Sequence, residues 1–265
     1  MKWLITGLNG TLAPVLAAHA QRRGAEVLAW RRDQLHVDDI PASSAWLQQA
    51  RPDAIAHLAM GSVDWARRLA QHAAEHGIAF VYTSTAMVFH HAPDGPHAVH
   101  DERNAQDGYG QYKRDCEDAV LQANPQACVV RLGWQIDPLR PGNNMLMALD
   151  QWQANEGRVS ASQAWKPACS FMEDSASVLA GLLLEPVPGV LHLDSNADEG
   201  HSFAQIVRAL KSAFRREAWS VHEHQDYVHD QRLAGGGALV PPLSARLPLL
   251  QQARQGKPGL RSTAQ

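Results

Sequence analysis

The chain is expected to fold as an α/β protein with a doubly wound parallel sheet and a smaller C-terminal lobe. Three observations predict this. Short apolar strands alternate with helices, a glycine turn joins the first strand to the first helix, and the alternation weakens after about residue 140. Strand–helix–strand units form parallel sheets through right-handed crossovers. A length of 265 residues allows one large domain or two modest ones.

The first strand, residues 2–6, is an apolar run that leads into a glycine turn at 7–13. Pro14 suits the first turn of a helix, which runs to about Arg23 before Gly24 stops it. Further along, Gly77 and the Asn124-Pro125 pair mark helix ends in the same way. The remaining elements expected in this half are strands 26–30, 53–59, 78–82 and 128–132, helices 42–50, 63–76 and 109–123, and a long loop at 89–107.

The second half has a less regular pattern. We expect helices at 142–153, 172–184 and 202–215, a strand at 189–193, a flexible loop at 233–242 around Gly235-Gly-Gly237, and a frayed polar end at 251–265. The predicted organisation is a cofactor-binding Rossmann domain at 1–140, a substrate lobe at 141–250 that is interleaved with it, and a flexible tail at 251–265.

Composition excludes several classes of protein. Hydrophobic residues make up 45% and charged residues 19%, which is ordinary for a globular chain. A net charge of −3 provides no basic field for a nucleic-acid backbone or an anionic membrane. Three cysteines (Cys116, Cys128, Cys169) are too few for a disulfide framework and fit a reduced, cytoplasmic setting. The uncharged stretch 3–21 resembles an export signal, but a glycine turn accounts for more of its residues.

The glycine turn, Thr6-Gly7-x-x-Gly10-x-x-Ala13, predicts a dinucleotide site. Glycines let the backbone turn tightly and approach a pyrophosphate, and the following helix offers free N–H groups and its positive dipole end to the anion. An acidic residue at the end of the second strand would bind a ribose 2′-OH, but this chain has Arg31 and Arg32 there. Two guanidinium groups favour a 2′-phosphate, hence NADP(H) over NAD(H); the alternative is a pair of solvated surface arginines.

Three residues further along the chain form a candidate catalytic set for proton transfer. Tyr109 and Lys113 are four residues apart on one face of a predicted helix. A lysine ammonium near a phenol lowers the pKa of that phenol, and the tyrosine then exchanges a proton with a carbonyl or alcohol oxygen. Thr85, at the end of the fourth strand, offers a hydroxyl to the same oxygen.

These residues resemble a known family, the extended short-chain dehydrogenases/reductases of the NAD-dependent epimerase/dehydratase type. Within it the chain most resembles the dTDP-4-dehydrorhamnose reductase branch. The matching motifs are Thr6-Gly7-x-x-Gly10-x-Leu12, Arg51-Pro-Asp-Ala-Ile-Ala-His-Leu-Ala59, Ser84-Thr85-x-x-Val88-Phe89, Tyr109-Gly110-x-x-Lys113 and Val130-Arg131-Leu-Gly-Trp134, with a fainter match to about residue 215.

The resemblance implies a reductase or epimerase of nucleotide-activated sugars. Tyr109 would then donate the proton, Lys113 would lower its pKa and hold the nicotinamide ribose, and Thr85 would bind the keto oxygen. The expected partner is a small molecule rather than a nucleic acid or membrane, and the chain is expected to be a monomer or homodimer. Expected cofactor contacts are Gly7, Leu8, Asn9, Gly10, Thr11, Leu12, Arg31, Arg32, Leu58, Ala59, Met60, Tyr109 and Lys113; expected substrate contacts are Ala86, Met87, Arg131, Trp134, Trp165 and Lys166.

Two departures from the family keep other functions open. Only Met60-Gly-Ser-Val63 separates the third strand from the next helix, and the Asn that supports the lysine in the family has no counterpart. The alternatives are a non-catalytic NADP-binding regulatory protein and a reductase of another carbonyl compound. His222-x-His224 with His229 suggests a metal site, but no cysteine or clear acidic ligand completes the set, so none is predicted.

Overall fold

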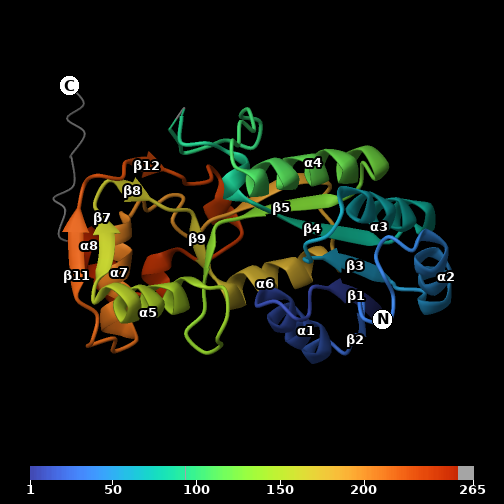
Figure 1. Cartoon of the computed structure of the whole chain (residues 1–265), viewed down its shortest axis with the longest axis horizontal. Coiled ribbons are helices and arrows are strands. Elements are labelled where there is room, and N and C mark those ends of the chain that lie inside the picture. The colour runs from blue at the N-terminus through green and yellow to red at the C-terminus, as the bar shows by residue number, and fades with distance from the viewer. Residues whose placement is uncertain (93, 256–265) are drawn as a thin grey trace, which may run out of the picture.

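The computed structural model describes residues 1–92 and 94–255. A six-stranded parallel sheet with the order β10-β5-β4-β3-β1-β2 forms its larger part (Figure 1). The strands are β1 (Lys2–Thr6), β2 (Glu26–Ala29), β3 (Ala54–His57), β4 (Ala79–Thr85), β5 (Cys128–Leu132) and β10 (Gly189–Leu193). The predicted α/β class and parallel sheet are confirmed, and β4 runs three residues further than expected, to the hydroxyl of Thr85.

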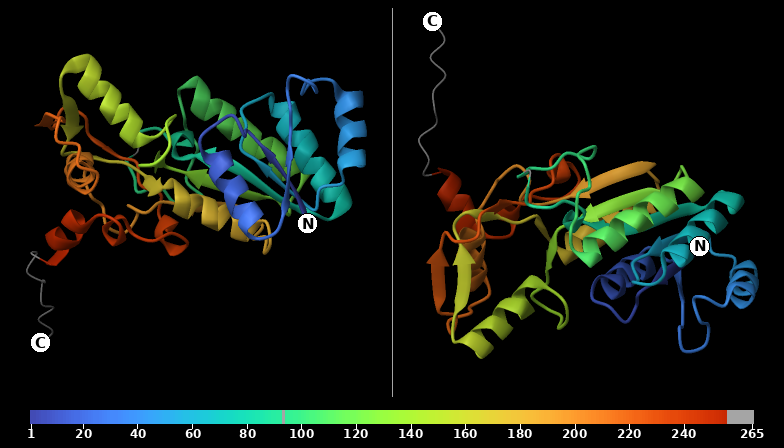
Figure 2. Two further views of the ribbon diagram at one scale, coloured as in Figure 1. Left: turned by 90° about the horizontal axis from the view of Figure 1, so that it is seen from below. Right: turned by 45° about the horizontal axis from the view of Figure 1, so that its top comes forward.

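Helices cover both faces of this sheet because successive side chains of each buried strand point to opposite faces. Trp3 and Ile5 of β1 pack with the layer of α1 and α6, whereas Leu4 packs with the layer of α3 and α4. Figure 2 shows α1 and α6 side by side. The helices are α1 (Leu12–Arg22), α2 (Ile40–Ala50), α3 (Val63–His76), α4 (Gly108–Ala123) and α6 (Met172–Leu182).

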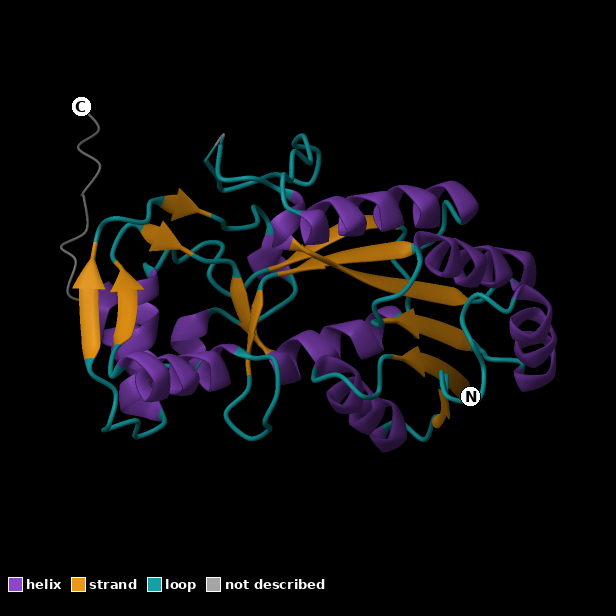
Figure 3. Cartoon of the chain, viewed as in Figure 1, coloured by secondary structure: helices purple, strands orange, loops and turns teal. Residues whose placement is uncertain are grey.

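The smaller lobe lies beyond the carboxyl ends of the strands (Figure 3). It contains three two-stranded parallel pairs: β6 (Trp134–Ile136) with β9 (Cys169–Phe171), β7 (Val159–Ser162) with β11 (Val221–His224), and β8 (Trp165–Lys166) with β12 (His229–Asp230). Its helices are α5 (Met145–Glu156), α7 (Phe203–Ala213) and α8 (Pro248–Gln255). Between these elements the chain returns to the main sheet at α6 and β10.

Two expectations for the C-terminal part were wrong. The segment 233–242 is packed rather than a loose loop: Leu233 and Val240 are buried, and a Cβ on Gly236 would lie 2.8 Å from Asp194. The first part of the expected frayed end is the helix α8, and residues 256–265 lie outside the described residues. In the described part of the chain, no helix is long and apolar enough to cross a membrane.

Candidate active site

A cleft of about 1500 Å³ lies at the carboxyl ends of the strands, between the sheet and the smaller lobe. Ligands of open parallel sheets bind in this position because the connecting loops diverge there. Its sheet side is formed by residues 7–13, 29–33, 58–60, 83–87 and 132–133, with Tyr109 and Lys113 from α4. Its lobe side is formed by Trp134, Gln135, residues 141–143, Trp165 and Gln231.

The glycine turn at one end of the cleft is held against the end of β3. The Thr6 hydroxyl oxygen accepts from the backbone N–H groups of Leu58 and Ala59 at 3.0 and 3.1 Å, and its own O–H bonds Nδ1 of His57 at 2.8 Å. His57 is fully buried, and burial lowers its pKa to about 3, so it stays neutral at physiological pH.

The start of α1 fits an anionic group. Its N-cap residue, Thr11, makes no side-chain bond to the helix, and the first turn contains no acidic residue. The first backbone N–H groups of the helix therefore remain available at the cleft wall, where they and the helix dipole favour a phosphate. The turn before it leaves room for one, because Gly7 has a φ of +84° and the N–H of Gly10 bonds the Gly7 carbonyl at 2.7 Å.

The Gly7→Ala variant is expected to bind NADPH roughly tenfold more weakly, since about 1.4 kcal/mol of strain corresponds to that factor. A Cβ at this position would lie 3.1 Å from the Ala59 nitrogen, and alanine is strained at a φ of +84°. Fluorescence titration measures the effect, with Gly24→Ala as the control: Gly24 has a φ of +75° but meets no atom within 4 Å and lies outside the cleft. Equal losses in both variants would show that backbone strain alone is responsible.

Arg31 and Arg32 both line the cleft, at the end of β2. The guanidinium of Arg32 lies 4.9 Å from the centre of the Trp65 ring and donates to the Met60 carbonyl oxygen. The side chain of Arg31 is exposed on the cleft wall. One guanidinium is thus fixed against the protein, and the other is available to a ligand.

The predicted catalytic residues come together at the middle of the cleft. Thr85 ends β4, and Tyr109 and Lys113 lie on the first turns of α4, whose N-cap Asp107 accepts from the Gly110 N–H at 2.8 Å. The Thr85 hydroxyl lies close enough to the Tyr109 phenol to lower the pKa of that phenol. Lys113 is 3% exposed, and its ammonium donates to the Thr83 carbonyl oxygen at 2.8 Å. The carbonyl of Thr83 therefore supports Lys113 in this chain, which lacks the Asn that supports the lysine in the family.

The electrostatics of this set differ from the expectation. Partial burial raises the pKa of Tyr109, and the neighbouring Thr85 hydroxyl reduces this effect. The Lys113 nitrogen lies 6.0 Å from the centre of the Tyr109 ring, and burial lowers the pKa of Lys113 to about 8. The expected lowering of the phenol pKa by the lysine is not found, because the ammonium is directed at Thr83. Tyr109 is therefore a protonated acid at neutral pH.

Four of the six expected substrate contacts line the cleft: Ala86, Met87, Trp134 and Trp165. The other two do not. Arg131 is 2% exposed and paired with buried Glu117, and Lys166 pairs with Asp230 at 3.3 Å. Arg131 occupies a strand position whose side chain points into the α4 layer, so the end of β5 does not bring it to the cleft.

Sequence reasoning missed several residues that line the cleft. Gln135 directly follows the Arg131–Trp134 motif, and its place next to Trp134 could have indicated that it lines the cleft. Asn143 and Gly142 belong to a loop that packs on the glycine turn: the Thr11 hydroxyl donates to the Asn143 carbonyl at 3.4 Å. Gln231 comes from the segment after β12, for which the local sequence gives no signal.

The sequence of the chain is similar to those of known proteins. The model of the RmlD substrate binding domain matches residues 1–232. A dTDP-4-dehydrorhamnose reductase of Mycobacterium tuberculosis is 30% identical over 217 residues, which are 74% of this chain and 70% of that protein. The enzyme of the same name from Sinorhizobium fredii is 29% identical, over 87% of this chain and 82% of that protein.

Solved structures share the fold. A dTDP-4-dehydrorhamnose reductase of Clostridium acetobutylicum superimposes with a TM-score of 0.78 at 19% identity, over 96% of this chain and 100% of that one. The same enzyme of Bacillus anthracis, solved with NADP, has a TM-score of 0.75 at 18% identity, over 97% and 99% of the chains. The family model covers most of the chain, so the chain belongs to the family of the RmlD substrate binding domain, and the predicted resemblance to the dTDP-4-dehydrorhamnose reductase branch is confirmed.

Proposed function

We propose that the protein is an NADPH-dependent reductase of a keto group on a nucleotide-activated sugar. The observation that carries this proposal is the convergence of Thr85, Tyr109 and Lys113 midway along a cleft whose one end fits a pyrophosphate. Relatives that share most of the chain are named as dTDP-4-dehydrorhamnose reductases. A purely regulatory NADP-binding protein would not need this set, so reduction is favoured over that alternative.

The residues of the cleft fit NADP(H). The open start of α1 and the glycine turn would hold the pyrophosphate, and Arg31 would bind the 2′-phosphate. Lys113 would hold the nicotinamide ribose, and residues 7–12 and 58–60, which line the same cleft, would contact the rest of the cofactor. Among the structural neighbours, the dTDP-4-dehydrorhamnose reductase of Bacillus anthracis was solved with NADP, and a Bordetella bronchiseptica enzyme was solved with NAD+. The exposed guanidinium of Arg31 favours NADP(H).

Each catalytic residue has one task. Thr85 holds the keto oxygen of the substrate, and Tyr109 donates its phenolic proton to that oxygen. NADPH, when bound, supplies the hydride to the carbonyl carbon. Trp134 and Trp165 offer aromatic faces on the lobe side of the cleft, where a nucleotide base or sugar ring stacks. Epimerisation beside the carbonyl would need a further residue that removes a proton there, and epimerisation at a carbinol carbon would need the oxidised intermediate to turn over before the hydride returns. Reduction is therefore the simpler reaction for this set.

A substrate panel tests the proposal. Purified protein is mixed with NADPH and keto sugars linked to dTDP, UDP or GDP, together with simple ketones and aldehydes, and the loss of NADPH absorbance is followed. Oxidation that depends on a nucleotide-linked keto sugar supports the proposal. Turnover of simple carbonyl compounds alone would favour the broader carbonyl reductase, and tight NADPH binding without any turnover would favour the regulatory protein.

The rate of reduction is expected to fall as the pH rises through about 8, the pKa of Lys113. The ammonium form donates to Thr83 and carries the positive charge near the reacting groups, and it is lost above that pH. Tyr109 does not produce this decrease, because its pKa is raised and it stays protonated. A pH profile of kcat between pH 6 and 10 measures the effect, with roughly tenfold loss per unit above the pKa. A flat profile would show that the charge of Lys113 is not needed.

A further inference from the structure

The helix α4 carries a third inward-facing polar residue, Glu117, one turn beyond Lys113. Glu117 is 0% exposed, and Arg131 of β5 binds both of its carboxylate oxygens, Nε to Oε1 at 3.0 Å and a terminal nitrogen to Oε2 at 2.8 Å. Burying a carboxylate is costly unless charged partners satisfy it. This fully buried pair lies outside the cleft and takes no part in the proton transfer described above.

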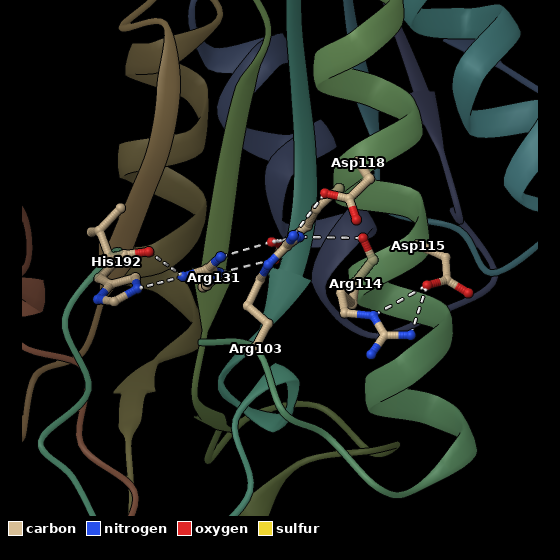
Figure 4. A network of polar contacts seen from close by, with 8 residues as sticks. Arg103, Arg114, Asp115, Asp118, Arg131 and His192 are labelled. Atoms are coloured by element: carbon tan, nitrogen blue, oxygen red, sulfur yellow. Dashed lines mark hydrogen bonds and ion pairs between the residues drawn. The ribbon is translucent and has the colours of Figure 1, made fainter. Parts of the chain in front are cut away.

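A second arginine binds the same carboxylate from the loop that precedes α4. Arg103 donates to Oε2 of Glu117 at 3.1 Å and to the exposed Asp118 at 2.7 Å. It also contacts the carbonyl of Arg114 at 3.4 Å. Figure 4 shows Arg103 reaching across from the loop to the helix. The loop at 89–107 is thereby tied to the helix that carries Tyr109.

Arg131 extends the contacts to the edge of the sheet. Its guanidinium donates to the Val99 carbonyl at 3.0 Å and to Nε2 of His192, in β10, at 3.3 Å (Figure 4). His192 in turn donates from Nδ1 to the Ala234 carbonyl at 3.2 Å, and burial lowers its pKa to about 4, so the ring is neutral and Nε2 accepts. We name Arg103, Glu117, Arg131 and His192 the Glu117 network; it joins α4, β5, β10 and the loop.

The strand register relates this network to the catalytic set. Arg131 lies opposite Ser84 in β4, between the pairs formed by Thr83 and Thr85. The Lys113 ammonium bonds the carbonyl of Thr83. Two successive turns of α4 are thus tied by buried charged groups to adjacent positions of β4 and β5. The helix cannot slide or rotate on the sheet without breaking one of these ties.

We propose that Glu117 is a positioning residue: through Arg131 it sets the register of α4 on β4 and β5, and so places Tyr109 and Lys113 relative to Thr85. The inference rests on the proposed reductase function. Displacing a reacting group by about 1 Å costs on the order of a hundredfold in rate. Glu117 also contributes its charge to the surroundings of Lys113, which a merely structural ion pair need not do.

The charge effect has a definite sign. Six titratable groups face Lys113: His57 of β3, Tyr82 of β4, and Tyr109, Tyr112, Cys116 and Glu117 of its own helix. His57 and Tyr82 are neutral, because burial lowers the pKa of His57 and raises that of Tyr82. Glu117 raises the pKa of Lys113, so its removal lowers that pKa and moves the alkaline loss of activity to lower pH.

The test compares three variants of the full chain. Glu117→Gln removes the buried charge. Asp118→Asn, the matched control, removes the neighbouring carboxylate that also binds Arg103 but is 60% exposed. Glu117→Gln combined with Arg131→Gln removes both buried charges, so that no unpaired guanidinium remains to destabilise the fold. The readouts are kcat, its pH profile, the Kd for NADPH and the thermal midpoint.

Glu117→Gln is expected to lower kcat roughly 10- to 100-fold and to shift the alkaline decrease about one pH unit lower, with the Kd for NADPH within about threefold. Asp118→Asn should match the wild type in all four readouts. The double variant should regain thermal stability while keeping the low kcat and the shifted profile. The proposal is overturned if the double variant also regains the wild-type kcat and pH profile, or if Glu117→Gln alone keeps both. In either case Glu117 serves only to neutralise the buried charge of Arg131.

Failure of the proposed function is separable from failure of this inference. If the wild type reduces no keto sugar, the reductase proposal fails, but the Lys113 side-chain nitrogen can still be titrated by NMR. A lower Lys113 pKa in the double variant than in the wild type and Asp118→Asn supports the role of Glu117, and equal values overturn it.

Discussion

Replacing Tyr109 by phenylalanine is expected to lower kcat for reduction by roughly 10²- to 10⁴-fold, the usual contribution of a general acid. The phenol lies beside the Thr85 hydroxyl and remains protonated at neutral pH, because its pKa is raised. Phenylalanine keeps the ring and loses only the proton donor, so the Kd for NADPH should stay within about threefold. Stopped-flow single turnovers with saturating NADPH measure the chemical step directly.

Tyr112→Phe is the matched control for this experiment. It removes a hydroxyl from the same helix, one that accepts from the Gly61 N–H at 3.1 Å and does not line the cleft. Its kcat should change by less than about threefold. Equal losses in both variants would point to a packing effect in α4, and unchanged turnover of Tyr109→Phe would refute the role of Tyr109 as acid.

The second large effect concerns the choice of cofactor. Arg31→Ala is expected to weaken NADPH binding roughly 10- to 100-fold, because a hydrogen bond to a charged group contributes about 1.5–3 kcal/mol. The Kd for NADH, which has no 2′-phosphate, should change by less than about threefold. Arg208→Ala removes an exposed arginine of the smaller lobe that pairs with Glu223, and serves as the control.

Calorimetric titration of both cofactors checks this prediction. The wild type should bind NADPH more tightly than NADH, and Arg31→Ala should remove most of the difference. Equal or tighter NADH binding by the wild type contradicts the assignment. A similar loss for both cofactors would mean that Arg31 contacts a part they share, such as the adenine ring.

The sequence was sufficient for the sheet domain because its signals are local. Each strand of the first 132 residues is a short apolar run, and its neighbours along the chain are helices ended by residues such as Gly77. The catalytic set followed from spacing within one helix and from a hydroxyl at a strand end. These signals need no knowledge of distant contacts, and the geometry brings the three residues together.

The smaller lobe could not be predicted in the same way, because its strands depend on distant partners. Val159 pairs with Val221 and Trp165 with His229, in strands of two to four residues that have little pattern of their own. The misplacement of Arg131 has a different origin. Its position after Val130 near a strand end suggested the cleft, but the alternation along β5 directs it to Glu117. Buried ion pairs of this kind carry no local sequence signature.

A crystal structure of the protein with NADPH tests the central claim most directly. We expect the pyrophosphate at the start of α1, the 2′-phosphate at Arg31, and the nicotinamide ring beside Thr85, Tyr109 and Lys113. A complex in which the nicotinamide lies away from Tyr109, or in which the cofactor occupies another part of the molecule, would contradict it.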